Sequence, residues 1–187
     1  RQDSLLLKFF CKYRKFVKNR LSSFYAVYLM LNLRQKMKTQ FDILRKSRQL
    51  VLKATTGLTL EQLHTIPDGF KNNIAWNVAH LVVTQQLLQY NLSGLDCLVP
   101  DELIEAHRKG TFPTKTFTEE EFEEVTELLI GLPDTLEEDF NEGIFENYTA
   151  YETSTGFVLD SFETAIHFNN YHEGIHLGII LAIKKLV

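Results

Sequence analysis

The sequence of 187 residues predicts an all-α protein built as a four-helix bundle. Four long segments repeat apolar residues at the three- and four-residue spacing of an amphipathic helix, and none shows the alternation of a strand. The polar and aromatic stretch 141–156 forms a long connection before the last helix, which permits a non-sequential helix order because it can cross one end of the bundle. No repeat or low-complexity linker divides the chain.

The first half of the predicted bundle contains two long helices. The first runs from Met37 to about residue 56, with apolar residues separated by lysine and arginine. A short helical turn is expected at 59–64, before a Pro-Asp-Gly turn. The second long helix, at 72–92, carries two neighbouring apolar stripes, so it is expected to pack on more than one side.

The second half contains the other two long helices. A short helix is expected near 100–107. The third long helix has a clear start, because Thr118 as N-cap and Glu121 three residues later form a capping box. Pro133 is expected to open a further helical turn. The last helix is predicted to run from about 157 to 186.

The charge is distributed unevenly along the chain. Residues 1–36 carry nine Lys or Arg and one acid, whereas residues 37–187 carry the remaining 11 basic and 23 acidic residues. The acidic body argues against nucleic acid as the main partner. We interpret residues 1–36 as a basic extension upstream of a native start at Met37, with a membrane-surface or targeting segment as the alternative. Residues 37–187 are then the domain, with no membrane partner expected.

The two cysteines give no sign of a disulfide framework or a thiolate metal site. Cys11 and Cys97 are far apart and neither belongs to a C-x-x-C pair. A reducing, cytoplasmic location is therefore the default expectation.

The most informative stretch contains two histidines near the C-terminus. His172 and His176 are four residues apart, so they lie on one face of a helix, and that face belongs to the apolar stripe. One histidine on an apolar face is usually an ordinary core residue, but two in register favour a shared divalent metal. His80, inward with Trp76 on the second long helix, is the third candidate ligand. Three neutral imidazoles with an open position are typical of a catalytic metal site.

Other residues are weaker candidates. His64 and His107 fall in loop or short-helix segments, and His167 is expected on the surface. The stretch from His172 also satisfies H-E-x-x-H, in which Glu173 would be the general base of a metalloprotease. No further ligand follows the motif, so a protease is disfavoured. Glu173 remains open as a base for metal-bound water or as an ordinary solvent-facing carboxylate.

Two motifs resemble those of the DinB/YfiT-like superfamily. The stretch Asn73-Ile-Ala-Trp-Asn-Val-Ala-His80-Leu is similar to its first-histidine motif, and Tyr171-His-Glu-Gly-Ile-His-Leu-Gly178 to its second and third histidines. The resemblance covers about residues 37–187. It implies an up-down-down-up four-helix bundle, often a homodimer, that holds a divalent metal such as zinc or nickel on three histidines.

The resemblance also implies an activity. Members with assigned activity are similar to metal-dependent thiol S-transferases that use low-molecular-weight thiols such as bacillithiol or mycothiol, and some relatives are isomerases. Coordination deprotonates a thiol at neutral pH, which makes a nucleophile for an electrophilic substrate. The alternatives are a metal-dependent hydrolase in which Glu173 assists a metal-bound water, and a non-catalytic stress-response module stapled by its metal.

One position departs from the superfamily pattern. Ile179 stands where many members carry glutamine, so a contact by that side chain is in doubt. Asn169 is a candidate for a polar group that supports the ligands, or else a polar residue in helix packing. Trp76 is the second candidate for a supporting group.

Overall fold

The computed structural model describes the backbone of residues 23–187 and the side chains of Tyr28 and residues 35–187. This part of the chain is mostly helical, as predicted, and its strands form a single small hairpin. The long helices are α2 (Ser23–Thr55), α4 (Ile74–Gln89), α6 (Glu119–Glu142) and α7 (Phe162–Ile183). The shorter elements are α3 (Leu60–His64), the 3₁₀-helix η1 (Asn91–Ser93), α5 (Asp101–His107), β1 (Tyr151–Glu152) and β2 (Val158–Leu159).

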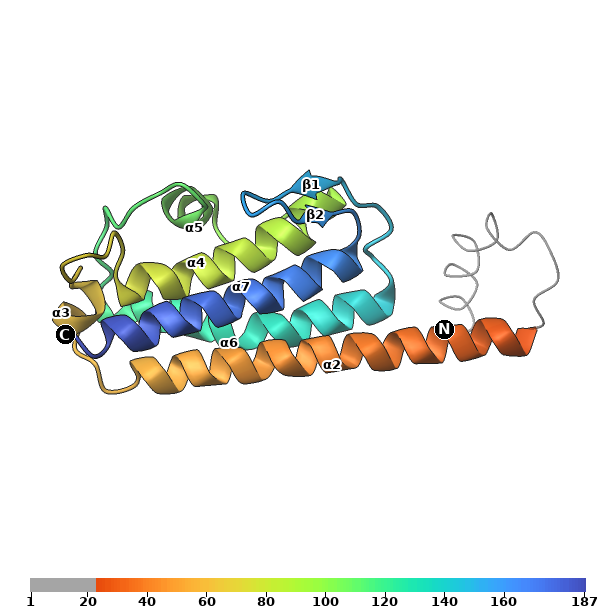
Figure 1. Cartoon of the computed structure of the whole chain (residues 1–187), viewed down its shortest axis with the longest axis horizontal. Coiled ribbons are helices and arrows are strands. Elements are labelled where there is room, and N and C mark those ends of the chain that lie inside the picture. Colours follow the sequence, from red (N-terminus) through yellow and green to blue (C-terminus); the bar gives the residue numbers. More distant parts are fainter. Residues whose placement is uncertain (1–22) are drawn as a thin grey trace.

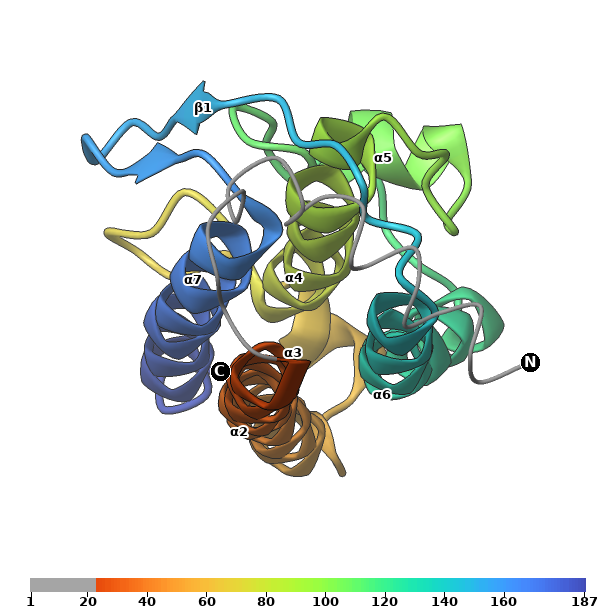
Figure 2. The ribbon, with the colours of Figure 1, turned by 90° about the vertical axis from the view of Figure 1, so that its right-hand side faces the viewer.

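The long helices lie side by side around a shared core (Figures 1 and 2). Helix α2 packs against α6 and α7, and α4 packs against the same two helices, so α2 and α4 occupy opposite corners. Figure 1 shows that α2 and α7 run in one direction and that α4 and α6 run in the other. Among the described residues, no helix is long and apolar enough to cross a membrane.

Helix α4 is the most deeply buried element. All of its residues are buried except Thr84 and Leu87, which confirms the expectation that it packs on more than one side. Its polar residues are stabilised where they find partners inside the protein, because an unpaired buried polar group is costly. Asn73 caps the helix by accepting a hydrogen bond from the backbone N–H of Trp76 at 2.8 Å.

Helix α2 begins well before the predicted start at Met37. It is continuous from Ser23, and Figure 1 shows its first part extending past the ends of the other long helices. Residues 23–36 contain neither glycine nor proline, so nothing in them interrupts a helix. Met37 is 2% exposed and belongs to the core. The interpretation of residues 1–22 as part of an extension lies outside the described residues.

The role predicted for Pro133 is also corrected. Pro133 does not open a new turn, because α6 continues through it to Glu142. Proline has no N–H, so the carbonyl of Leu129, four residues earlier, loses its usual helical partner. The Nη1 of Arg48, on α2, donates to that carbonyl at 3.1 Å. A side chain from another helix thus satisfies the acceptor that proline leaves free.

Helix α7 is shorter than predicted because a hairpin precedes it. Strands β1 and β2 pair antiparallel, and Gly156 in the turn between them has a φ of 83°, which favours glycine. The helix then starts from Ser161, whose side chain accepts from the N–H of Thr164. The hairpin was not predicted because strands of two residues are too short to show an alternating pattern.

A buried ion pair connects the long helices. Arg48 and Glu173 are both 0% exposed, and Nε and Nη2 of the arginine lie 3.0 and 2.9 Å from Oε1 of Glu173 on α7. The guanidinium also donates to Oε1 of Gln85 and to the carbonyl of Leu81, both on α4. With its bond to Leu129 on α6, one side chain of α2 contacts all three other long helices.

The position of Glu173 excludes the solvent-facing carboxylate considered from the sequence. Burial raises its pKa, whereas the charge and hydrogen bonds of Arg48 act in the opposite direction. Removing one member of such a pair is expected to be far more damaging than replacing both, since a single buried charge would remain without a partner.

Arg48→Ala is therefore expected to lower the free energy of unfolding by about 3–5 kcal/mol, measured by urea denaturation. The double variant Arg48→Met/Glu173→Leu should recover most of that loss. Arg45→Ala is the matched control: Arg45 makes partly exposed ion pairs with Asp134 and Glu137, and its loss should cost no more than about 1 kcal/mol. Equal losses for the two arginines would contradict this assignment.

Candidate metal centre

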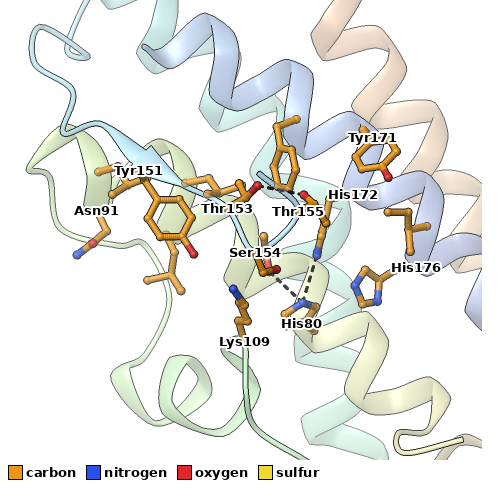
Figure 3. Close-up of a pocket in the computed structure, with 16 residues that line it drawn as sticks. His80, Asn91, Lys109, Tyr151, Thr153, Ser154, Thr155, Tyr171, His172 and His176 are labelled. Carbon is orange, nitrogen blue, oxygen red and sulfur yellow. Dashed lines mark hydrogen bonds between the residues drawn. The ribbon is translucent and has the colours of Figure 1, made fainter. Parts of the chain in front are cut away.

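Three histidines from two adjacent helices converge at one point (Figure 3). His80 comes from α4, and His172 and His176 come from successive turns of α7. One ring nitrogen from each lies within 4.8 Å of the others, and the Nε2 atoms of His80 and His172 are 3.3 Å apart. The structure thus brings together the three ligands predicted from the sequence.

The spacing of these nitrogens suits a first-row divalent metal. Two nitrogen ligands about 2.1 Å from a tetrahedral ion lie about 3.4 Å apart. The 3.3 Å between His80 and His172 is close to this value. Two nitrogen lone pairs that face each other at this distance repel, unless a cation or a proton lies between them.

The ring of His80 is held in one orientation by two contacts. Its Nδ1 lies 2.6 Å from the backbone carbonyl of His107, and a carbonyl can only accept, so Nδ1 carries the proton. Nε2 is then the atom with a free lone pair. Trp76 stacks on the ring with centroids 4.6 Å apart and planes at 11°, and its indole N–H donates to Thr111. Trp76 thus packs against the ring of His80, and its role as a supporting group stays a prediction.

The ring of His176 is held by Asn77, which sequence reasoning missed. Its Nδ1 lies 2.7 Å from Oδ1 of Asn77. The amide of Asn77 can present only its oxygen, because its nitrogen donates to the carbonyl of Asn73 at 2.6 Å and to the side chain of Asn72. Nε2 of His176 is thus left as the ligand atom. An asparagine in a largely apolar helical segment, one turn before His80, was the available signal.

His172 is the ligand closest to the outside. It is half-buried and lines a cavity, while its Nδ1 is buried without a hydrogen-bond partner among the described residues. Phe168, one turn earlier, packs beside its ring. The position of His172 gives the site its contact with the cavity.

All three rings are neutral at physiological pH. Burial lowers the pKa of His80, and it lowers the pKa of His172 to about 2 and that of His176 to about 3, with the neighbouring imidazoles adding to both shifts. Neutral imidazole is the form that binds a metal. The site is therefore prepared to take up a cation without first releasing protons.

Glu173 and Asn169 are not brought together with the histidines. Neither lines the cavity, and both are fully buried. Glu173 pairs with Arg48, whereas the side chain of Asn169 forms no hydrogen bond with any described residue. Asn169 fits the second interpretation considered for it, a polar residue in helix packing.

The other histidines of the described residues lie outside this cluster. His64 donates to the carbonyl of Leu60 and accepts from the backbone N–H of Phe117, so both of its nitrogens are used. His107 is buried and stacks on Phe117. His167 is exposed, as predicted.

A cavity of about 440 Å³ opens beside the histidines. On the helix side its wall is largely apolar, with Leu87, Leu88, Phe168 and Ile175. On the other side the hairpin contributes hydroxyl groups, from Tyr151, Thr153, Ser154 and Thr155. The hydroxyl of Thr84 lies 3.3 Å from Nε2 of His80. A small molecule in this cavity would reach the ligand nitrogens directly.

The fold and the three histidines together define a candidate helical metalloprotein. The family model of the DinB superfamily matches residues 43–180, which include all three histidines. Because the match covers most of the chain, the protein belongs to the DinB superfamily. A comparison with curated proteins finds no significant match.

His172→Ala and His176→Ala are each expected to abolish the binding of about one equivalent of divalent metal, because two imidazoles no longer complete the site. The measurement is elemental analysis of protein purified under reducing conditions. His167→Ala, an exposed histidine on the same helix, is the matched control and should retain the metal. Metal content that persists in both ligand variants would refute the assignment.

The metal-free protein is expected to lose stability as the pH falls below about 6.5, the ordinary pKa of histidine in the unfolded chain. Below that pH the unfolded chain binds protons on both histidines, whereas in the folded protein His172 and His176 become protonated only near pH 2 and 3. At pH 5 this costs at most about 2 kcal/mol for each histidine. Urea denaturation in chelator at pH 7.5 and 5 tests the effect, and the His172→Ala/His176→Ala variant should show a flatter dependence. Parallel dependences would contradict it.

Proposed function

We propose that this protein is a divalent-metal-dependent thiol S-transferase, with His80, His172 and His176 as the metal ligands. The observation that carries the proposal is the opening of a largely apolar cavity directly onto three neutral imidazoles, two of which are held in orientation by hydrogen bonds. Zinc and nickel both suit a site made of nitrogen ligands. The bound metal would lower the pKa of a thiol, ordinarily about 8.5, so that the thiolate forms at neutral pH.

The chain's own groups have supporting roles in this proposal. Asn77 and the carbonyl of His107 hold two of the rings, so the ligand atoms need no rearrangement. The apolar wall excludes water from the thiolate, which keeps it nucleophilic. The hydroxyl of Thr84 can donate a hydrogen bond to a group bound beside His80. In the transfer, sulfur forms a bond to the electrophilic carbon, the leaving group departs with its electron pair, and the thiol proton passes to solvent.

The proposal extends to the helix arrangement, the domain bounds and the oligomeric state of the protein. We infer that the four long helices form the up-down-down-up bundle of the superfamily, and that residues 37–187 are the domain. The packing order of the helices and their directions support the first inference. The burial of Met37 and a family match that begins at residue 43 support the second. A homodimer in the cytoplasm remains part of the proposal.

Two alternative functions would need different features of the site. A hydrolase with Glu173 as base would need that carboxylate near the metal, but it is fully buried and paired with Arg48. A non-catalytic module is favoured by one observation: the ligands come from two different helices, so a bound metal would tie α4 to α7. Chelation would then lower the melting temperature without any thiol transfer being present.

The cobalt-loaded protein is expected to develop a sulfur-to-cobalt charge-transfer band when 2-mercaptoethanol is added, and to transfer that thiol to monochlorobimane. His172→Ala/His176→Ala should show neither signal. If the wild-type protein binds cobalt without developing the band, thiol transfer is ruled out. A band without turnover on any thiol and electrophile pair would favour the non-catalytic module.

The role of Glu173 can be tested in the same assay. Arg48→Met/Glu173→Leu is expected to keep its metal and its turnover, because neither side chain lines the cavity. A variant that holds the metal but has lost turnover would return Glu173 to the mechanism.

A further inference from the structure

The wall of the cavity differs in charge from the rest of residues 37–187. Residues 37–187 carry 23 acidic and 11 basic side chains. Among the described residues that line the cavity there is no aspartate or glutamate, and the one formal charge belongs to Lys109. A divalent metal on the histidines would add to this positive charge. With a metal bound, every formal charge at the cavity wall would be positive, which would favour anionic ligands.

Lys109 lies in a turn whose two ends are hydrogen-bonded to side chains of the candidate metal centre. On one side, the carbonyl of His107 accepts the hydrogen bond from Nδ1 of His80. On the other side, the hydroxyl of Thr111 accepts from the indole N–H of Trp76 at 3.2 Å. Within the turn, the N–H of Thr111 donates to the carbonyl of Arg108.

Gly110 completes the turn with a φ of 93°, a conformation that other residues rarely adopt. The backbone of Lys109 is therefore held by the same two side chains, His80 and Trp76, that build the centre. Because its backbone is held, Lys109 has a defined position relative to the three histidines, although its own side chain is exposed. Figure 3 shows this side chain pointing into the cavity, on the side of His80 and Ser154.

The ammonium of Lys109 forms no hydrogen bond or ion pair with any described residue. This distinguishes it from Lys115, a few residues later, which lies 2.7 Å from Glu121, and from Lys184, which donates to the carbonyl of Ala54. A cation that lines a cavity and has no protein partner is available to a ligand.

We propose that Lys109 binds an anionic group of the substrate, so that the substrate combines a carboxylate or similar anion with an apolar body. The inference rests on the proposed function in placing this substrate in the same cavity. The apolar wall of Leu87, Leu88 and Ile175 receives the body of the molecule. The hydroxyl of Ser154, on the hairpin, can donate a second hydrogen bond to the anion. Lys109 thereby selects among thiols or electrophiles that the metal alone would not distinguish.

The test uses pairs of thiols that differ only in charge. Mercaptohexanoate and mercaptohexanol are titrated into the cobalt-loaded protein, with mercaptopropionate and mercaptopropanol as a shorter pair. Calorimetry gives the ratio of their affinities, and absorption gives the sulfur-to-cobalt band. The ratio tests Lys109, whereas the band tests the proposed thiol chemistry.

In wild type, at least one carboxylate thiol should bind about threefold to fivefold more tightly than its alcohol partner at low salt, the upper range for an exposed ion pair. Lys109→Gln should bring the ratio close to one, and Lys109→Arg should keep most of the preference. Lys115→Gln, which removes an equal charge outside the cavity, is the matched control and should behave as wild type. Added salt should reduce the preference.

The two hypotheses fail in different ways. Equal ratios in wild type and Lys109→Gln would overturn the role of Lys109, while a band in both proteins would leave thiol coordination intact. Absence of the band, with a ratio that still depends on Lys109, would overturn the thiol chemistry and keep the anion site. Since Lys109 has no partner among the described residues, Lys109→Gln should unfold at the same urea concentration as wild type.

Discussion

The buried contact of Arg48 with Glu173 lies where all four long helices meet, and the burial of this face of α7 is the constraint on which the site depends. Glu173 lies on that face and meets the guanidinium in the interior. Successive residues of a helix are rotated by about 100°, so His172 and His176 lie about 100° and 60° from Glu173 on the same side. With position 173 buried against α2, both histidines face α4, where His80 lies. The residue that resembles a catalytic base in the sequence is therefore part of the buried face of its helix.

Helix α4 imposes the second constraint. It is buried on nearly all sides, so its polar side chains are stabilised where they find a partner within the protein, as Asn77 and His80 do. Asn73 caps the helix and also accepts, through its carbonyl, from the amide of Asn77. Asn77 in turn holds His176, a ligand on another helix. The helix start and the metal centre are thus parts of one hydrogen-bonded chain, which explains why an asparagine is stable at a fully buried position.

The segments outside the long helices give the centre its surroundings. The turn that follows α5 is joined to His80 through the carbonyl of His107 and to Trp76 through Thr111. The hairpin between α6 and α7 supplies hydroxyl groups to the opposite side of the cavity. The long helices therefore position the three histidines, whereas these irregular segments form the other walls of the cavity beside them. This division is common in proteins that place binding groups on loops carried by a rigid scaffold.

The sequence by itself determined the helical segments and the three histidines. Hydrophobic periodicity located the four long helices, and the capping box of Thr118 and Glu121 is present at the start of α6. The four-residue spacing of His172 and His176 fixed their common face, because that spacing is a local property of a helix. Only the tertiary structure decided the role of Glu173, the support from Asn77 and the place of Lys109. Each depends on a partner from a distant part of the chain: 125 residues separate Arg48 from Glu173, and 99 separate Asn77 from His176. Periodicity carries no information about such pairs, since it describes one helix at a time.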